Sequence, residues 1–150
     1  MIEIGFVGEV AGLELGEVRR LSGSGIIPVI SPLSVDAGEE GVTLNVNADI
    51  VAAAIATELR ATKLIFISDV PGLMRDPAAT DSLIPSLNRE QISRLMKDRI
   101  ISGGMIPKVA SALEALGNGV EKVHFIDGRV AHSLLLAIFS SRGIGTEIVP

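Results

Sequence analysis

The segment Lys63–Ser68 places the strongest constraint on the fold of this 150-residue chain. Its four central residues, Leu64–Ile67, are all apolar. A strand with no polar face is typical of parallel sheets that helices cover on both sides. The segment is followed by Asp69-Val70-Pro71-Gly72, a strong turn signal. The segment therefore predicts an α/β fold built around a buried strand.

The rest of the chain predicts strands that alternate with helices of about ten residues. Strands are expected at Ile2–Val10, Ile26–Ile30, Val42–Asn47, Lys122–Ile126 and Thr146–Val149. Helices are expected at Leu13–Leu21, Ala48–Arg60, Asn88–Lys97, Met105–Leu116 and Ala131–Ser140, and a turn-rich connection at Ser31–Gly41. This alternation predicts a mostly parallel sheet sandwiched by helices, in a single domain over residues 1–150.

Composition excludes several classes of function. The formal charge is −5 and aromatic residues make up 3% of the chain, whereas a nucleic-acid groove needs a basic stripe and usually stacking rings. The chain has no cysteine, so it forms no disulfide, thiolate nucleophile or cysteine-ligated metal site. The spacing of its two histidines, His124 and His132, does not match a metal site. No nucleic-acid partner and no protein-held metal are therefore expected.

Membrane and secretory signals are also missing from the sequence. The longest apolar runs fall far short of the ~20 residues that span a bilayer. No basic segment followed by an apolar one opens the sequence. A cytoplasmic protein without a membrane partner is predicted.

Three segments are expected at the carboxyl ends of strands, where ligands bind in open parallel sheets. The first, Asn45–Asp49, carries two amides and a carboxylate where a strand leads into a helix. The amides offer donors and acceptors to a small polar ligand, and Asp49 can position cationic groups or Mg²⁺. An N-cap role for Asn47 and a first-turn role for Asp49 explain the pattern equally well.

The other two segments suit a nucleotide and its phosphates. Ser68–Leu73 can line a base or ribose, or it can simply turn the chain. Ser102–Lys108 places two glycines before a helix with a lysine about one turn inside it. Backbone N–H groups at a helix N-terminus bind phosphate, and Lys108 would stabilise charge on a transferred phosphoryl group. A solvated surface lysine fits this pattern as well.

The common catalytic motifs are missing. The sequence contains no P-loop, no dinucleotide-binding GxGxxG and no GxSxG nucleophile elbow. His124 lies in an apolar strand, which is typical of a hydrogen-bonded core histidine. His132, near a helix start, is expected to act as a cap, with a contact to a ligand as the alternative.

Taken together, the motifs resemble those of the N-acetylglutamate kinases of the amino acid kinase superfamily. The order and spacing agree for Gly5–Val10, Asn45–Asp49, Ser68–Leu73, Ile101–Lys108 and Ile126–Arg129. The resemblance implies ATP-dependent phosphorylation of the γ-carboxylate of N-acetyl-L-glutamate to an acyl phosphate, a step of arginine biosynthesis.

The resemblance also implies roles for individual residues. Asn45, with Asn47, resembles the residues that hold the substrate, Asp49 the carboxylate that organises catalytic lysines, and Lys108 the transition-state stabiliser. The residues similar to those that wrap the nucleotide are Asp69, Val70, Pro71, Gly72, Leu73, Met74, Ile100, Ile101 and Ser102. ATP and Mg²⁺ are the implied cofactors, with Mg²⁺ held mainly through the nucleotide.

The sequence departs from these kinases in length. The kinases are roughly twice as long, and their N-terminal half supplies a lysine and a Gly-Gly loop to the phosphates and an arginine to the substrate. The chain therefore resembles the C-terminal, nucleotide-binding lobe, with the N-terminal substrate lobe as its missing partner. Such a chain is expected to be inactive alone and to self-associate. The alternatives are a non-catalytic nucleotide- or amino-acid-binding module and a kinase for acetylaminoadipate.

Overall fold

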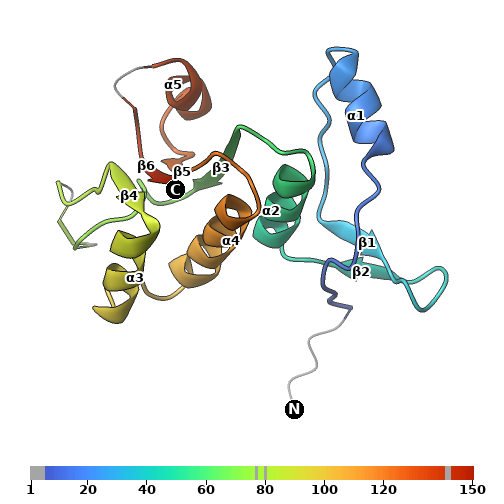
Figure 1. Cartoon of the computed structure of the whole chain (residues 1–150), viewed down its shortest axis with the longest axis horizontal. Coiled ribbons are helices and arrows are strands. Elements are labelled where there is room, and N and C mark those ends of the chain that lie inside the picture. The colour runs from blue at the N-terminus through green and yellow to red at the C-terminus, as the bar shows by residue number, and fades with distance from the viewer. Residues whose placement is uncertain (1–5, 77, 80, 141–142) are drawn as a thin grey trace. The chain divides into compact units, whose positions relative to one another are not determined.

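The computed structural model describes residues 6–76, 78–79, 81–140 and 143–150 (Figure 1). The chain divides into two compact units, Met1–Ile55 and Ala56–Pro150. The helix α2 (Ala48–Glu58) begins in the first unit and ends in the second. That residues 1–150 form one nucleotide-binding lobe stays a prediction, because the division into compact units does not say which part binds a nucleotide.

Besides the start of α2, the described part of the first unit contains one short helix and a small antiparallel sheet. The helix α1 spans Gly16–Gly23, and the strands β1 (Leu33–Val35) and β2 (Thr43–Asn45) pair with each other. In the turn between the strands, the Asp36 carboxylate accepts hydrogen bonds from two backbone N–H groups, those of Gly38 and Glu39. The turn-rich connection predicted at Ser31–Gly41 therefore contains a strand, β1, that the sequence pattern did not indicate.

Two predicted strands of this unit differ in the structure. Ile26–Ile30 forms no strand, because no described segment pairs with it. Val7 forms an isolated parallel bridge with Asn45, and residues 2–5 of the predicted first strand lie outside the described residues. A β-branched run favours extended backbone, but a strand also needs a neighbour to take its hydrogen bonds.

The second unit is built on a four-stranded sheet in the order β3-β5-β6-β4. The strands are β3 (Lys63–Ser68), β4 (Ser86–Asn88), β5 (Lys122–Asp127) and β6 (Thr146–Val149). The pairs β3/β5 and β4/β6 are parallel, whereas β5/β6 is antiparallel. The predicted α/β class is therefore confirmed, with β4 as a further short strand.

Three helices accompany this sheet: α3 (Arg89–Lys97), α4 (Met105–Gly117) and α5 (Ser133–Phe139). Asn88 and Gln91 form a capping box that fixes the start of α3. The core centres on β5, in which Val123–Ile126 are all buried, and Phe125 stacks on Phe66 of β3 at a centroid distance of 5.2 Å.

The most apolar predicted strand is not buried on both faces. Leu64 and Phe66 of β3 are buried, but Ile67 is 53% exposed. The reason is that β3 is the first strand in the order of the sheet, whereas β5 lies between two neighbours. Among the described residues, no helix is both long and apolar enough to cross a membrane.

Candidate nucleotide site

A pocket of about 190 Å³ in the second unit brings together two loops that are far apart in the sequence. One wall comes from the loop after β3 and the other from the segment between α3 and α4. The lining residues are Val70, Gly72, Leu73, Met74, Ile100, Ile101, Ser102 and Met105. Of the residues that the sequence predicts around a nucleotide, Asp69 and Pro71 do not line the pocket.

The first wall is anchored by one buried hydroxyl. Oγ1 of Thr146 accepts a hydrogen bond from the backbone N–H of Leu73 at 2.8 Å and donates to the carbonyl of Ile84 at 2.7 Å. Thr146 and Leu73 are 0% and 3% exposed. Gly72 has a φ of +148°, and a Cβ there would lie 2.6 Å from Thr146 Oγ1. The wall is therefore fixed by β6, to which Thr146 belongs.

The second wall follows the C-terminus of α3. Arg99 adopts a left-handed φ of +58°, which turns the chain out of the helix. The N–H groups of Ile100 and Ile101 then donate to the carbonyl of Leu95 at 2.9 and 3.3 Å. Ile101 is 5% exposed. This short, fixed segment holds Ser102 at the pocket.

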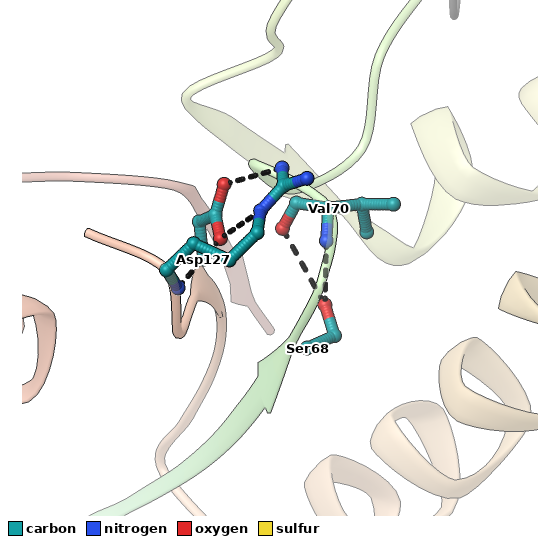
Figure 2. Close-up of polar contacts among 4 residues, drawn as sticks. Ser68, Val70 and Asp127 are labelled. Carbon is teal, nitrogen blue, oxygen red and sulfur yellow. Dashed lines mark hydrogen bonds and ion pairs between the residues drawn. The ribbon is translucent and has the colours of Figure 1, made fainter.

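A polar cluster lies where β3 and β5 end (Figure 2). Ser68 is the register partner of Asp127, and the carbonyl of Ser68 accepts from Gly128 N–H at 2.8 Å. The Asp127 carboxylate accepts from the backbone N–H, Nε and Nη2 of Arg129 at 2.8–2.9 Å. The exit of β3 toward the pocket is thus tied to the turn after β5.

The charges in this cluster affect each other. The Arg129 side chain holds the pKa of the Asp127 carboxyl below its usual value through its hydrogen bonds. The same contact raises the pKa of Arg129, and the charge of Asp69 adds to that rise. Asp69 therefore lies within electrostatic reach of Arg129, beside the pocket rather than in it.

The start of α4 offers fewer backbone donors than the sequence suggests. Met105 and Ile106 N–H already donate to the carbonyls of Ser102 and Gly103, and Pro107 has no N–H. Gly103 is left-handed, with a φ of +56°, and Gly104 is right-handed, with a φ of −65°. Successive residues of opposite hand direct their N–H groups toward a common point, which suits an anion. Lys108 follows on the same helix and is half-buried.

The predicted substrate residues lie in the first unit. Asn45 ends β2. Its backbone N–H donates to the carbonyl of Phe6, and its carbonyl accepts from the N–H of Gly8. The side-chain oxygen of Asn47 accepts from the N–H groups of Asp49 and Ile50 at 2.9 and 3.3 Å, so Asn47 caps α2. Asp49 is half-buried in the first turn of this helix. Substrate contacts by Asn45 and Asn47, and the role of Asp49, stay predictions.

The sequence pattern missed Met105 as a pocket residue. Met105 follows Ser102 by three residues, a spacing that could have indicated it.

The sequence gave partial answers for both histidines. Nε2 of the buried His124 bonds the carbonyl of Ile144, but Nδ1 has no partner among the described residues. His132 occupies the N-cap position of α5 with a φ of +59°, and its side chain makes no cap hydrogen bond. His132 therefore stands at the predicted cap position without capping α5 through its side chain, and a ligand contact stays a prediction.

Comparison with known proteins identifies the family. The sequence profile of the amino acid kinase family matches residues 1–127. The chain belongs to the amino acid kinase family. It is 52% identical to an acetylglutamate kinase of Akkermansia muciniphila over 148 residues and 49% identical to that of Heliobacterium modesticaldum over 147 residues. These matches cover 99% and 98% of this chain, but it spans only about half the length of either relative.

Two solved structures of known enzymes have a similar fold. N-acetylglutamate synthase from Neisseria gonorrhoeae, complexed with coenzyme A and L-arginine, has a TM-score of 0.86 at 28% identity. The match covers 97% of this chain and 32% of the synthase. A carbamate kinase from Giardia lamblia has a TM-score of 0.70 at 21% identity, over 91% of this chain and 44% of that enzyme, which shows the fold alone.

The part of the chain that the structure describes holds no group of three or more His, Asp or Glu side chains placed for a metal.

Proposed function

We propose that this chain is the nucleotide-binding half of an acetylglutamate kinase, which phosphorylates the γ-carboxylate of N-acetyl-L-glutamate with ATP. The observation that carries the proposal is the pocket that joins Val70–Met74 to Ile100–Ser102. The 52% identity to an acetylglutamate kinase over 148 residues supports the substrate. ATP and N-acetyl-L-glutamate are both anionic, so the chemistry needs cations and N–H dipoles where the two meet.

The pocket suits the uncharged end of the nucleotide. Its walls are mostly apolar side chains, and Ser102 adds a hydroxyl. Ligand pockets commonly combine apolar walls with a few polar groups that fix orientation. We assign the adenine and ribose to this pocket, with Met105 as a contact beyond those that the sequence indicates.

The phosphates belong at the start of α4. The backbone changes from a left-handed conformation at Gly103 to a right-handed one at Gly104, which directs N–H groups to a common point. Lys108, on the same helix, is proposed to stabilise the charge that develops on the transferred phosphoryl group. Mg²⁺ typically binds through substrate phosphates and one or two carboxylates, so it would enter with the ATP. Bound there, Mg²⁺ neutralises phosphate charge.

The acceptor is assigned to the first unit and to the missing half of the enzyme. Asn45 and Asn47 are proposed to hold N-acetyl-L-glutamate, with Asp49 orienting the cationic groups nearby. The cap at α2 uses only the oxygen of the Asn47 amide, so its NH₂ group can still donate to a substrate carboxylate. The isolated chain is expected to bind the nucleotide without turnover.

Calorimetric titration of the isolated chain with the ATP analogue AMP-PNP and Mg²⁺ tests the nucleotide assignment. Ser102→Phe would place a ring in the pocket and is expected to weaken binding at least about tenfold. Ser93→Phe is the matched control, since Ser93 is an exposed serine on α3 outside the pocket. Equal binding by the two variants would contradict the assignment.

Mixing the chain with the part of the Akkermansia enzyme that it does not match tests the activity. Hydroxylamine converts the acyl phosphate product to a hydroxamate that can be measured. N-acetyl-L-glutamate is expected to react much faster than acetylaminoadipate. Faster reaction of acetylaminoadipate would reassign the substrate.

A second candidate is a non-catalytic amino-acid-binding module. It draws support from the TM-score of 0.86 with a synthase that was solved with bound L-arginine. The same calorimetry separates the two functions. Saturable binding of an amino acid without any binding of AMP-PNP would favour the module.

A further inference from the structure

Arg129 is an exposed arginine whose orientation is nevertheless fixed. Its side chain is 65% exposed, whereas that of its partner Asp127 is 12% exposed. Nε and Nη2 of Arg129 donate to separate oxygens of the Asp127 carboxylate at 2.9 and 2.8 Å. Two parallel N–H groups on one carboxylate fix the direction of a guanidinium as well as its position. Because an exposed ion pair adds little to stability, the fixed guanidinium suggests a role at a site.

The pair lies at the edge of the sheet where the nucleotide pocket is found. Asp127 is the last residue of β5 and the register partner of Ser68, the last residue of β3. Both strands are parallel, so both chains leave the sheet on the same side. Asp69 follows Ser68, and Val70 already lines the pocket. The turn that carries Arg129 is therefore the neighbour of the loop that forms the first wall.

Direct contacts tie this turn to the pocket loop (Figure 2). The N–H of Gly128 donates to the carbonyl of Ser68 at 2.8 Å, and Oγ of Ser68 contacts the N–H and the carbonyl of Val70 at 3.4 Å each. A Cβ at Gly128 would lie 2.7 Å from the side chain of Ile67, so the turn packs closely on β3. A change in the turn should therefore be felt where the pocket loop begins.

Asp69 is the acidic residue between the turn and the pocket. It is exposed, and its charge contributes to the raised pKa of Arg129. Two carboxylates, those of Asp127 and Asp69, thus act on one guanidinium. Asp127 takes two of the N–H groups of Arg129, and a guanidinium has further N–H groups to offer. Arg129 can therefore restrict the orientation of the Asp69 side chain.

Asp69 is placed to meet the sugar of a nucleotide. The pocket measures about 190 Å³, which is below the ~300–1,000 Å³ of sites that enclose a whole drug-sized ligand. The ribose hydroxyls would therefore lie at its mouth, where Asp69 precedes Val70. In dinucleotide-binding α/β folds an acidic residue accepts a hydrogen bond from a ribose hydroxyl. A carboxylate near phosphates also repels them, and a neighbouring guanidinium offsets that charge.

We propose that Arg129, held by Asp127, is a positioning residue that directs Asp69 onto the ribose hydroxyls and so makes the site selective for ribonucleotides. The proposal deepens the proposed function and rests on it, because it needs a nucleotide in the pocket. Asp69 makes the contact with the sugar, and Arg129 acts through Asp69. Loss of Arg129 should therefore weaken binding of a nucleotide that has ribose hydroxyls more than binding of one that lacks them.

The test is calorimetric titration of the full chain with ADP or with 2′,3′-dideoxy-ADP, each with Mg²⁺. The unmodified chain is expected to bind ADP at least about tenfold more tightly, as hydrogen bonds to a charged acceptor allow. Arg129→Gln is expected to reduce this ratio to less than about threefold, mainly by weakening ADP. Arg129→Lys keeps the charge without the fork, so an intermediate ratio is expected.

A second pair of variants shows whether Arg129 acts through Asp69. Asp69→Asn is expected to lower the ratio of the two affinities as Arg129→Gln does. Adding Arg129→Gln to Asp69→Asn should then lower the ratio no further, because both changes remove the same contact. Additive effects on the ratio would overturn the proposed route through Asp69.

The matched control is Arg94→Gln. Arg94 is 70% exposed, forms an ion pair with Glu90 on α3 and does not line the pocket. This variant is expected to keep the ratio of the unmodified chain. An unchanged ratio in Arg129→Gln, an equal change in Arg94→Gln, or an equal weakening of both nucleotides by Arg129→Gln would overturn the proposal. The last result would show that Arg129 supports the loop without selecting the sugar.

Failure of this inference is distinguishable from failure of the proposed function. Equal affinity of the unmodified chain for ADP and 2′,3′-dideoxy-ADP would refute the sugar selectivity and leave the nucleotide assignment standing. No binding of either nucleotide by the folded, unmodified chain would refute both. Far-ultraviolet circular dichroism confirms that each variant is folded before its affinities are compared.

Discussion

Thr146→Val tests whether one buried hydroxyl holds the wall of the nucleotide pocket. Valine has the size and shape of threonine, so the variant leaves no cavity around β6. It removes the acceptor of the Leu73 N–H, bonded at 2.8 Å, and the donor to the Ile84 carbonyl, bonded at 2.7 Å. Thr146 is 0% exposed and Leu73 3%, so water cannot readily replace the lost hydroxyl.

The expected cost follows from the two groups left behind. A buried donor or acceptor without a partner costs about 1–3 kcal/mol. The variant leaves one of each, so we expect the free energy of unfolding to fall by about 2–6 kcal/mol. Thr146→Ser keeps the hydroxyl and removes one methyl group, which costs about 1 kcal/mol. The hydrogen bonds therefore predict that the valine variant is the less stable of the two.

Urea denaturation followed by far-ultraviolet circular dichroism measures this order, because the chain has no Trp or Tyr to report by fluorescence. Calorimetry with AMP-PNP measures the local effect, since Leu73 lines the pocket. We expect weaker nucleotide binding for Thr146→Val than for Thr146→Ser. If the serine variant is the less stable, methyl packing rather than hydrogen bonding anchors the wall, and the reasoning is refuted.

Three further predictions follow from the structure. Gly145→Ala is expected to destabilise the fold more than Gly143→Ala in urea denaturation, because both have a positive φ but only a Cβ at Gly145 would lie 2.0 Å from the Phe125 carbonyl oxygen; equal losses would contradict the clash. Burial, with a smaller contribution from nearby lysines, lowers the pKa of His124 below 6.5. The unfolded chain therefore binds a proton more readily than the folded one, so the free energy of unfolding should fall as the pH drops below 6.5. His124→Gln should reduce this dependence of stability on pH, measured by urea denaturation at several pH values. An unchanged dependence would show that other groups cause it. Lys108→Ala in the assembled kinase should lower kcat by about 10²-fold or more, whereas near-normal turnover would exclude its role.

The elements that the sequence predicted well carry their signals locally. The capping box at Asn88 sets the start of α3, and α4 ends at Gly117, one residue after the predicted Leu116, where Asn118 and Gly119 follow. The strand β6 has the predicted bounds, Thr146–Val149. Each of these signals lies within a few residues of the feature that it determines, so no tertiary information is needed to read it.

The errors concern elements whose fate depends on a distant partner. Ile26–Ile30 has the composition of a strand but forms none, because a strand exists only when another segment pairs with it. Leu64–Ile67 predicts a strand buried on both faces, yet Ile67 is 53% exposed because β3 lies at the edge of the sheet. Hydrophobic periodicity describes one segment and does not contain the order of strands in a sheet.

The candidate site also combines features that local sequence predicts with features that depend on distant residues. Each loop of the pocket could be recognised from its own motif, and their meeting in one pocket could be expected from the position of ligands in α/β sheets. The anchor of the first wall could not be recognised, since Thr146 belongs to none of the motifs and follows the matched family segment, which ends at residue 127. A single threonine in an apolar strand carries no sequence signal for a partner 73 positions away.

This anchor links the stability of the last strand to nucleotide binding. Gly145 lets the chain pass close to the Phe125 carbonyl, and Thr146 follows directly in β6 with its hydroxyl on Leu73 and Ile84. A change that loosens β6 should therefore loosen the pocket wall as well, although β6 contributes no residue to the pocket lining. The converse also holds by linkage: a nucleotide bound against Leu73 should slow exchange of the Leu73 amide and of β6 together. Protection confined to Ile100–Ser102 would show that the two walls respond independently.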